Sequence, residues 1–382
     1  MSAIIIGGGI GGLTAAIALQ RNGIEAQVFE STQALQPLGA GILIPPNAMT
    51  LFEQLGVAAK IKAQGAMIRK ITLADMQGRP LTEKSAEYFD DGHYQLTIAI
   101  HRSALQNILV QVLKPRTLRM GKRCTKVDTF PDYALARFAD GSQVKGDFVV
   151  GADGIQSVVR QSIFPSTTLR YCGQTCWRGL APIALVKQYA DHLVEIWGRG
   201  TRFGYVRIEP KLVYWYATQS IESGGTDDPA TLRSRLFSLF SNFPAPISAI
   251  LAQTPTHSII RTDIHDLRPL NSWSLGRIIL IGDAAHAAAP NLGQGAAQSV
   301  EDAQALADCI KRHKTIEAAF IDFEHLRVPK AKKITDLSWR IGKMTNVRNA
   351  LGCTVRNALL RQTPAWVLQR QVNRMYCVRT PE

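Results

Sequence analysis

The stretch Gly282–Ala303 brings together residue types that bind a phosphorylated, partly anionic group. A short apolar strand, Arg277–Ile281, leads directly into it, and Asp283 stands at the end of that strand. After a loop, Gly293-Gln294-Gly295 opens an Ala-rich helix. An acid at a strand end and a helix that begins on glycine suit such a cofactor, because the first N–H groups of a helix point at an anion. Alone, this stretch indicates only an anion site.

A second glycine-rich segment lies near the N-terminus. The apolar strand Ala3–Ile6 is followed by Gly7-Gly8-Gly9-Ile10-Gly11-Gly12 and an Ala-rich helix, and then by the strand Glu25–Phe29, which ends at Glu30. Strand, GxGxxG, helix and a later acid are the order of a dinucleotide-binding βαβ unit. A plain Gly-rich turn with a surface Glu remains the alternative. Together the two glycine-rich segments predict FAD, with its ADP end at the first and its reactive end at Gly282–Ala303.

The rest of the first half reads as alternating strands and helices. We expect a helix at Ala104–Val112 with Ser103 as its N-cap, because a serine side chain can accept a hydrogen bond from the first turn. Strands are expected at about Arg123–Asp128, Ala134–Ala139 and Phe148–Gly151, the last one followed by Asp153-Gly154 and a helix from about Ser157.

Residues 170–265 are rich in aromatic side chains, and they differ in pattern from the nucleotide-binding segments. Alternation in Gly204–Ile208 and Leu212–Thr218 favours antiparallel strands. From Val328 onward the pattern is helical, with a break near Thr363-Pro364. We therefore predict an α/β protein with a Rossmann-like FAD-binding domain of discontinuous sequence, an inserted mixed β-sheet substrate domain and a C-terminal helical segment. The expected bounds are 1–67, 101–169 and 266–327 for the FAD-binding domain, 68–100 and 170–265 for the substrate domain, and 328–382 for the helical segment.

Composition excludes several classes of protein. The chain has 382 residues, and it has no apolar run of the ~18 residues that a membrane-spanning helix needs. No Lys or Arg precedes the apolar N-terminal run, so a signal peptide is not expected. The six cysteines are scattered without CxxC pairs. We expect reduced thiols in a cytoplasmic protein, and no metal site.

The net charge of +14 is unevenly distributed. Residues 327–382 hold 12 Lys and Arg against two acids, so most of the positive charge belongs to the C-terminal segment. No nucleic-acid-binding motif accompanies it, and we expect no nucleic-acid partner. Apolar and basic residues interleave at Trp339–Met344 and Val355–Leu360, and Trp366–Leu368 adds an apolar patch. This predicts either a helical cover with its basic face in water or a peripheral contact with an anionic membrane.

Three motifs resemble, in this order, those of the FAD-dependent aromatic hydroxylases: GxGxxG with Glu30, then Asp153-Gly154, then Gly282-Asp283. These are single-component flavoprotein monooxygenases with the p-hydroxybenzoate hydroxylase fold, and the resemblance covers essentially the whole chain. Quinolone-hydroxylating members are the most similar ones, and urate- and salicylate-type members are less similar in the substrate block. The stretches that carry this similarity are Val150–Arg160, Leu169–Arg178, Glu195–Gly204 and Pro290–Ala296.

The resemblance also implies cofactor contacts. They are Gly7, Gly9, Gly11 and Gly12 for the pyrophosphate, Glu30 with Ser31 for the ribose, Arg102 for phosphate or ribityl oxygens, the backbone near Cys124 for adenine, Asp153 for FAD and NAD(P)H, Asp283 for the ribityl chain, Pro290 for the flavin ring, and Gly293, Gln294, Gly295 and Ala296 for the pyrimidine ring. The plainer alternatives are a surface arginine at 102, a strand-end turn at 153 and an N-cap at 283. His286, in the same turn as Asp283, is interpreted as a structural histidine rather than a base.

For the substrate, the resemblance implies Arg178, Arg202 and Tyr214, each of which could instead be a surface cation or a core aromatic residue. No catalytic side chain is singled out, because a flavin C4a-hydroperoxide would be the oxidant and the protein would mainly position the ring and exclude water.

The function predicted in this way is NADPH- or NADH-dependent insertion of one oxygen atom from dioxygen into a small aromatic or heteroaromatic substrate, with a 4-quinolone as one candidate. A salicylate- or urate-type hydroxylase and a non-hydroxylating FAD oxidoreductase are the alternatives. The CxxxxC pair of disulfide reductases and the WxWxIP signature of tryptophan halogenases are absent from the sequence. We expect a monomer or a homodimer.

Overall fold

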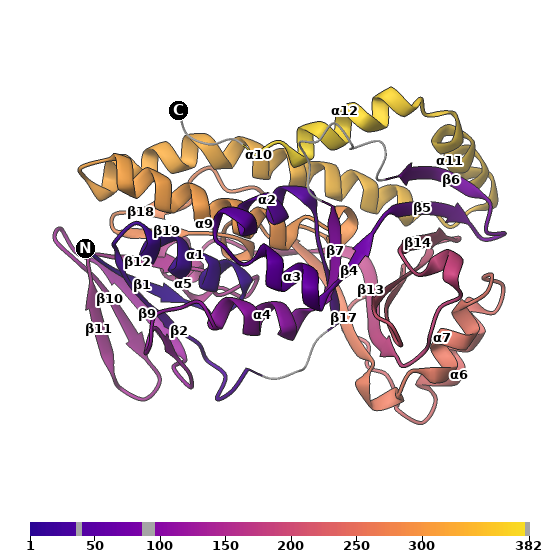
Figure 1. The fold of residues 1–382 in the computed structure, drawn as a ribbon, viewed down its shortest axis with the longest axis horizontal. Coiled ribbons are helices and arrows are strands. Elements are labelled where there is room, and N and C mark those ends of the chain that lie inside the picture. Colours follow the sequence, from indigo (N-terminus) through magenta and orange to yellow (C-terminus); the bar gives the residue numbers. More distant parts are fainter. Residues whose placement is uncertain (36–39, 86–95, 379–382) are drawn as a thin grey trace.

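A sheet assembled from three distant parts of the chain forms the centre of the nucleotide-binding region (Figure 1). The computed structural model describes residues 1–35, 40–85 and 96–378. β1 (Ser2–Ile6) pairs in parallel with β2 (Glu25–Phe29) and with β12 (Phe148–Gly151), and β19 (Ile278–Leu280) lies parallel to β12. The carboxyl ends of β1, β12 and β19 therefore meet at one edge of the sheet, where a doubly wound fold binds its ligand. The two outer strands are β8 (Leu118–Arg119) and β18 (Ser274–Leu275).

α1 packs against the strands of this sheet, and apolar side chains of strands and helices form a continuous core. α1 packs against α9, the Ala-rich helix that follows the second glycine-rich segment. The helices of this region are α1 (Ile10–Arg21), α4 (Arg102–Val110), α5 (Val158–Ile163), α8 (Asp283–His286), α9 (Gly295–Arg312) and α10 (Ile316–Thr345). A small antiparallel sheet lies beside them, made of β9 (Cys124–Thr129), β10 (Ala134–Phe138) and β11 (Gln143–Gly146).

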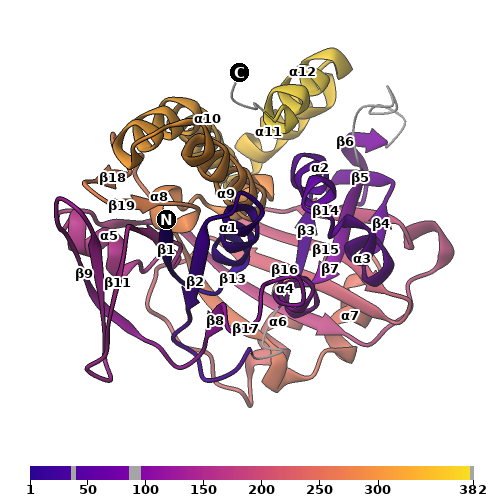
Figure 2. The ribbon, with the colours of Figure 1, turned by 60° about the vertical axis from the view of Figure 1, so that its left-hand side comes forward.

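A seven-stranded mixed sheet forms the second region. Its order is β17 (Ile260–Leu267), β13 (Leu169–Ala181), β16 (Leu212–Gln219), β15 (Thr201–Glu209), β14 (His192–Trp197), β5 (Lys70–Asp75) and β6 (Pro80–Ser85). Side chains alternate between its faces. One face packs Trp177, Phe203 and Trp215 under α6 (Leu232–Phe240) and α7 (Ile247–Gln253), and Figure 2 shows these two helices on the side of the sheet away from α1 and α4. The other face is turned toward the nucleotide-binding region.

A three-stranded sheet joins the two regions. It consists of β3 (Gly41–Ile44), β7 (Thr97–His101) and β4 (Ala66–Ile68), and it is accompanied by α2 (Pro46–Gln54) and α3 (Ala58–Gln64). Apolar residues of β3, β4 and β7 pack against the seven-stranded sheet. The approach is close, because a Cβ on Gly41 would lie 2.6 Å from the Tyr214 ring.

The C-terminal part is helical, as predicted, and the chain breaks between α11 (Ala350–Gln362) and α12 (Ala365–Tyr376) at the predicted Thr363-Pro364. The boundary expected at 327/328 falls inside α10, which continues through Pro329 to Thr345. Ser103 is not the N-cap of α4. The helix begins two residues earlier than expected, at Arg102, and the His101 side chain accepts the hydrogen bond from the Ser103 N–H. Among the described residues, no helix is both long and apolar enough to cross a membrane.

Candidate functional site

The loop between β1 and α1 is shaped by glycines. Gly7 has a φ of 108°, and a Cβ there would lie 2.4 Å from the Ala152 carbonyl oxygen. A Cβ on Gly12 would lie 2.0 Å from the Gly7 carbonyl oxygen. In contrast, a Cβ on Gly9, the residue that caps α1, would meet nothing within 4 Å. Space is therefore left at the N-terminus of α1, where unpaired N–H groups can bind an anion.

Two of the predicted cofactor residues make contacts that support the protein's own structure. A Cβ on Gly11 would lie 3.0 Å from the Ser299 Cβ, so Gly11 allows α1 to approach α9. The Asp153 carboxylate accepts hydrogen bonds from the Ser157 hydroxyl at 2.5 Å and from the Val158 N–H at 2.7 Å, and it thereby caps α5. Burial raises the pKa of this carboxyl. The direct cofactor contacts of Gly11 and Asp153 stay predictions.

Glu30 closes over the glycine loop from the end of β2. One carboxylate oxygen accepts from the Gly8 N–H at 2.8 Å, and the other accepts from the Thr32 N–H at 2.9 Å and from the Ser31 hydroxyl at 3.2 Å. Burial acts to raise the pKa of Glu30, but the hydrogen bonds from Thr32 and Gly8 outweigh it, so the pKa lies below its usual value. A charged acceptor is thus held beside the loop, as binding of ribose hydroxyls requires.

The segment that leads to Cys124 runs alongside Glu30. The Lys122 N–H donates to the Glu30 carbonyl at 2.8 Å, and Cys124 begins β9 two residues later. The Cys124 thiol is buried and directed at the Lys126 carbonyl, and burial raises its pKa to about 11. The thiol therefore stays neutral and offers no charge to a ligand, so the predicted contact near Cys124 remains one of the backbone.

Arg102 and Asp283 are near enough for the charge of the arginine to act on the carboxyl group. Each is the first residue of a short helix, α4 or α8, and each side chain is exposed to solvent. The protein packed around Asp283 raises the pKa of its carboxyl group although the side chain reaches solvent, while the charges of His286 and Arg102 act in the opposite direction. In the described part of the chain, no hydrogen bond reaches the Asp283 carboxylate. A position next to it is open, because the atom nearest to a Cβ on Gly295 would be the Asp283 Oδ1 at 3.8 Å.

The loop before α9 presents backbone to the same space. Pro290 begins a short 3-10 turn, and Gly293 follows with a φ of 63°, a conformation that favours glycine. A Cβ on Gly293 would meet nothing within 4 Å. Gly295 and Ala296 open α9, so their N–H groups have no partner within the helix. Gln294 is the exception in this loop, because its side chain turns inward and is buried.

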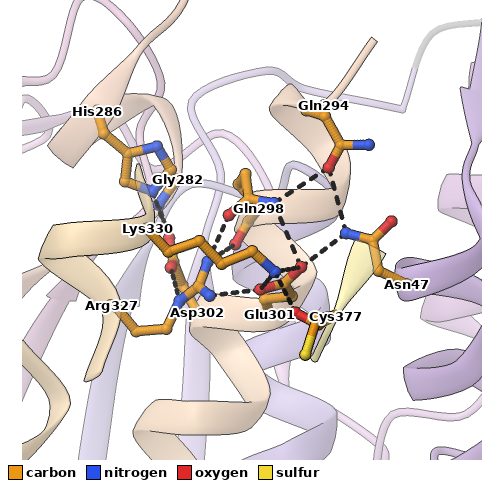
Figure 3. Close-up of polar contacts among 10 residues, drawn as sticks. All are labelled: Asn47, Gly282, His286, Gln294, Gln298, Glu301, Asp302, Arg327, Lys330 and Cys377. Carbon is orange, nitrogen blue, oxygen red and sulfur yellow. Dashed lines mark hydrogen bonds and ion pairs between the residues drawn. The ribbon is translucent and has the colours of Figure 1, made fainter. Parts of the chain in front are cut away.

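His286 is a structural residue, as predicted. Its Nε2 lies 2.6 Å from an Asp302 oxygen that also accepts from the Gly282 N–H at 2.8 Å, and the other Asp302 oxygen accepts from Arg327 Nε at 2.7 Å (Figure 3). Burial acts to raise the pKa of Asp302, but His286 and Arg327 outweigh it and lower the pKa to about 2. This ionised carboxylate fixes the turn that carries Asp283.

Glu301, the neighbour of Asp302, extends this network. It is paired with Arg327, and Lys330 Nζ lies 2.7 Å from one Glu301 oxygen and also donates to the Cys377 carbonyl at 2.7 Å. The network therefore joins α9, α10 and the end of α12. The sequence offered a signal in the adjacent acids at 301 and 302, but nothing in it showed that their cationic partners lie one helix later.

The same network holds the loop of Gln294 from behind. Asn47 Nδ2 donates to Glu301 at 2.6 Å and to Gln294 Oε1 at 3.2 Å, and Gln298 Nε2 also donates to Gln294 Oε1 at 3.1 Å (Figure 3). Two buried atoms, Asn47 Oδ1 and Gln294 Nε2, find no hydrogen-bond partner among the described residues. A buried donor and acceptor without partners are expected where a ligand or water completes the site.

The open glycine positions, the Asp283 carboxylate without a hydrogen bond among the described residues, and the unpaired amide atoms together fit FAD. They offer N–H groups to its phosphates and pyrimidine ring and acceptors to its hydroxyl groups, which matches the chemistry of the donor set.

The predicted substrate residues Arg178, Arg202 and Tyr214 share one face of the seven-stranded sheet. Tyr214 is opposite Leu180, two residues from Arg178 on β13, so their side chains point the same way. Arg202 is opposite Thr218, which lies two and four residues from the tyrosines of β16. This face is turned toward β3, since Tyr214 lies against Gly41, and toward the loop Pro290–Gln294 before α9, which we call the cofactor loop.

Sequence reasoning missed three residues on that face. The Tyr216 hydroxyl and the Trp197 indole N–H both donate to the Glu195 carboxylate, and Arg202 Nη1 lies 3.6 Å from it. Tyr216 packs against two apolar clusters, one that includes Leu43 and one that includes Ala289, the residue before Pro290. It therefore lies between β3 and the cofactor loop. An indirect signal was present, because Glu195 and Trp197 fall in the stretch Glu195–Gly204 that carried the resemblance.

Comparisons with known proteins agree with this geometry. A family model described as an FAD binding domain matches residues 1–336. The chain is 39% identical over 366 residues to aurachin C monooxygenase/isomerase of Stigmatella aurantiaca, with 94% of each chain covered. It is 31% identical to 2-heptyl-3-hydroxy-4(1H)-quinolone synthase of Pseudomonas aeruginosa, with 98% of each covered. The crystal structure of Klebsiella pneumoniae HpxO with FAD and uric acid superposes with a TM-score of 0.91 at 26% identity and covers 98% of this chain and 96% of that one. The prediction of fold class and cofactor is confirmed, and the chain belongs to the family of FAD-dependent aromatic monooxygenases.

Proposed function

We propose that this monooxygenase hydroxylates a heteroaromatic ring of the 4-quinolone type, with NADPH or NADH as reductant and dioxygen as the source of oxygen. Bound FAD would store the electrons and activate dioxygen, which no side chain can do. The observation that carries the proposal is the position of Tyr216, which packs against both the β3 cluster and the cluster of Ala289. Two relatives named for the aurachin and alkylquinolone reactions support the choice of ring.

The cofactor contacts are part of this proposal. Gly7, Gly9 and Gly12 would bring the N-terminus of α1 to the pyrophosphate, with Gly11 supporting the helix behind it. The remaining contacts would be Glu30 and Ser31 with the ribose, the backbone at Cys124 with adenine, Arg102 with phosphate or ribityl oxygens, Asp283 with the ribityl chain, Pro290 with the flavin ring, and the N–H groups of Gly293–Ala296 with the pyrimidine ring. Asp153 would act through the loop it supports.

The side chains of the substrate face would bind and orient the ring rather than transfer protons in an obligatory step. Burial raises the pKa of Tyr214, and the nearby Arg178 only partly opposes this, so the phenol remains a hydrogen-bond donor. Arg178 and Arg202 supply positive charge on the same face. A ring held there would be shielded from water by the sheet on one side and by the cofactor loop on the other.

A substrate screen tests the proposal. Purified FAD-loaded protein is given NADPH or NADH with 4-quinolones, salicylates, urate and hydroxynicotinates, and oxidation of the reductant is compared with the mass of the product. We expect a product heavier by one oxygen atom from a quinolone. Oxygenation of only salicylate or urate would favour those alternatives, and peroxide without any oxygenated product would contradict the hydroxylase assignment.

We also propose that the C-terminal segment touches an anionic membrane surface. On α11 the exposed side chains include Leu351, Val355 and Leu359, spaced one turn apart, and Trp366 of α12 is exposed as well. Residues 337–381 contain eight Lys and Arg and no acid, so an anionic surface is the complementary partner. Trp339, which was part of the predicted interleaved pattern, is engaged elsewhere, because Arg170 stacks on its ring at 3.4 Å.

Sedimentation with vesicles tests this contact. We expect the protein to co-sediment with phosphatidylglycerol vesicles at low salt, and a Leu351→Ser/Val355→Ser/Leu359→Ser variant to remain in solution. The matched apolar-to-serine change Ile321→Ser, at an exposed position of α10, is not expected to alter binding. If the α11 variant instead loses a homodimer seen by analytical ultracentrifugation, the stripe is a subunit contact. We propose either a monomer or a homodimer. The six cysteines are free thiols, which agrees with the proposed cytoplasmic location.

A further inference from the structure

Four strands of the seven-stranded sheet carry one row of facing residues. Arg178 on β13 is opposite Tyr216 on β16, Tyr216 is opposite Gly204 on β15, and Gly204 is opposite Glu195 on β14. Neighbouring strands lie ~4.8 Å apart, so the row spans about 14 Å from the arginine to the glutamate. Because paired residues point to the same face, the whole row is turned toward the cofactor loop.

Gly204 allows Tyr216 to reach Glu195. A Cβ on Gly204 would lie 2.2 Å from Cζ of the Tyr216 ring, so the ring lies across β15 at the only kind of residue that leaves room for it. The hydroxyl at its end donates to the Glu195 carboxylate. A tyrosine that lay upright on the sheet would not reach a side chain two strands away.

At the Glu195 end of the row, the Glu195 carboxylate and the Tyr216 phenol oxygen offer acceptors. Burial, and then the charge of Glu195, raises the pKa of Tyr216 well above its usual value, so the phenol keeps its proton and directs it at Glu195. The free lone pairs of the phenol oxygen remain acceptors. The Glu195 side chain is 19% exposed, and its negative charge is matched by Arg202.

The opposite end of the row is a donor. Arg178 is half-buried and donates to the Thr262 hydroxyl at 2.9 Å. Among residues 1–35, 40–85 and 96–378, no carboxylate forms an ion pair with it. Its charge is therefore available to an oxygen of a ligand, with a strength that a charge-assisted hydrogen bond gives.

We propose that Glu195, acting through Tyr216, is the specificity-determining residue for a ring that carries an N–H or O–H donor at one end and a carbonyl or enol oxygen at the other. The donor faces Tyr216 and Glu195, and the oxygen faces Arg178. A neutral vinylogous amide, the arrangement in a 4-quinolone, has these two groups on opposite sides of its ring. This inference rests on the proposed function, and it assigns Glu195 and Tyr216 as positioning residues.

Binding to the FAD-loaded protein, without reductant, tests the inference. The change in flavin fluorescence is titrated with a 2-alkyl-4(1H)-quinolone, with its N-methyl derivative and with salicylate. We expect wild type to bind the N–H compound at least tenfold more tightly than the N-methyl compound, because only the former has a donor for the acceptor end. In Glu195→Gln this preference is expected to fall to threefold or less, because the amide lets Tyr216 turn its proton toward the ring.

The same variant offers a gain of binding that damage to the fold would not produce. Removal of the negative charge is expected to raise the affinity for salicylate at least threefold in Glu195→Gln. Glu209→Gln, on the exposed end of β15, is the matched control and is expected to leave all three affinities unchanged. Tyr216→Phe removes the phenol acceptor and is expected to lose the N–H preference as well, so it decides the matter if Glu195→Gln does not bind FAD.

The outcomes separate the two proposals. If wild type binds none of the ring compounds, the proposed function fails. If wild type binds the quinolone but does not distinguish it from the N-methyl derivative, or if both variants keep the preference, the assignment of Glu195 is overturned while the proposed function stands.

Discussion

Two carboxylates, Glu301 in the network behind the cofactor loop and Glu195 on the proposed substrate face, have very different surroundings. The Glu301 side chain is 2% exposed, pairs with Arg327 and with Lys330 at 2.7 Å, and is closed off by α10. The Glu195 side chain is 19% exposed, and its cation, Arg202, is 3.6 Å away. Glu301 is paired with two cations and closed off from solvent, whereas Glu195 has one more distant cation and remains partly open to solvent.

The difference between these surroundings suits a loop that holds a resident cofactor on one side and exchanges a substrate on the other. Behind the loop, charges that are fully compensated in a dry setting hold the backbone in one conformation, because breaking any pair strands a charge. In front of it, a partly exposed carboxylate with neutral donors can exchange a partner for a substrate at small cost. The cofactor side is therefore built for rigidity, and the substrate side for discrimination.

The largest effect is expected from Arg327→Met. Arg327 bonds Asp302 at 2.7 Å, pairs with Glu301 and is 3% exposed, so its loss leaves two carboxylates under-compensated in the core. Removal of one partner of such a pair costs ~3–5 kcal/mol of unfolding free energy. Urea unfolding of the FAD-loaded protein measures it. Arg69→Met, which removes an exposed pair with Asp191, is the control, and a loss of stability no larger than in this control would contradict the comparison.

A second effect depends on pH and concerns Asp302. Its pKa is about 2 in the folded protein, against 3.8 ordinarily. A carboxylate with a lowered pKa stabilises the fold fully above its unfolded value, and this stabilisation is lost as the pH falls through the folded pKa. Between pH ~4 and ~2 the unfolding free energy should therefore drop by roughly 2 kcal/mol on account of this group.

Asp302→Asn separates this contribution from the general effect of acid. The variant is expected to be less stable at pH 7 and to lose less additional stability as the pH is lowered from 5 toward 3. Glu222→Gln, at an exposed position, is expected to follow wild type. Parallel slopes for wild type and Asp302→Asn would show that the network behind the loop does not depend on this charge.

Gly204→Ala tests the substrate side. The added methyl group displaces the Tyr216 ring from β15 and breaks its contact with Glu195, because a Cβ there would lie 2.2 Å from the ring. We expect quinolone binding to weaken about tenfold, or ~1.4 kcal/mol, with FAD affinity unchanged. Titration of flavin fluorescence measures both. An equal loss of FAD affinity would mean that the two sides of the loop are not independent.

The sequence was sufficient for the cofactor side because its signals are local. Gly7 and Gly12 are needed for backbone contacts within one loop and its neighbouring strand, and the strand before Asp283 is read from its own apolar run. Adjacent residues therefore predicted both the fold and the cofactor. The N-cap of α4 was misassigned for an equally local reason, since the His101 side chain accepts from the Ser103 N–H and the helix therefore begins before Ser103.

The substrate side could not be read in the same way, because it depends on register between strands. Glu195, Gly204 and Tyr216 are neighbours only because β14, β15 and β16 pair at those positions, and a shift of one residue would turn each side chain to the other face. The ion pair between Arg327 and Glu301 likewise depends on how α10 packs on α9. Such pairs are set by tertiary packing, which a single sequence does not display.

The smallest effect is expected from Trp197→Phe, which tests whether Glu195 is as open to water as its surroundings indicate. The indole N–H is one of two neutral donors to Glu195, and the ring also packs under Arg356 at 5.3 Å, a contact that Phe keeps. An open carboxylate can replace a lost neutral donor with water, so quinolone binding should weaken only about threefold, or ~0.7 kcal/mol. Titration of flavin fluorescence with the quinolone, run in parallel on Gly204→Ala, measures this loss of affinity. A loss as large as that of Gly204→Ala would mean that Glu195 is as closed as Glu301, because only a carboxylate cut off from water needs every one of its donors.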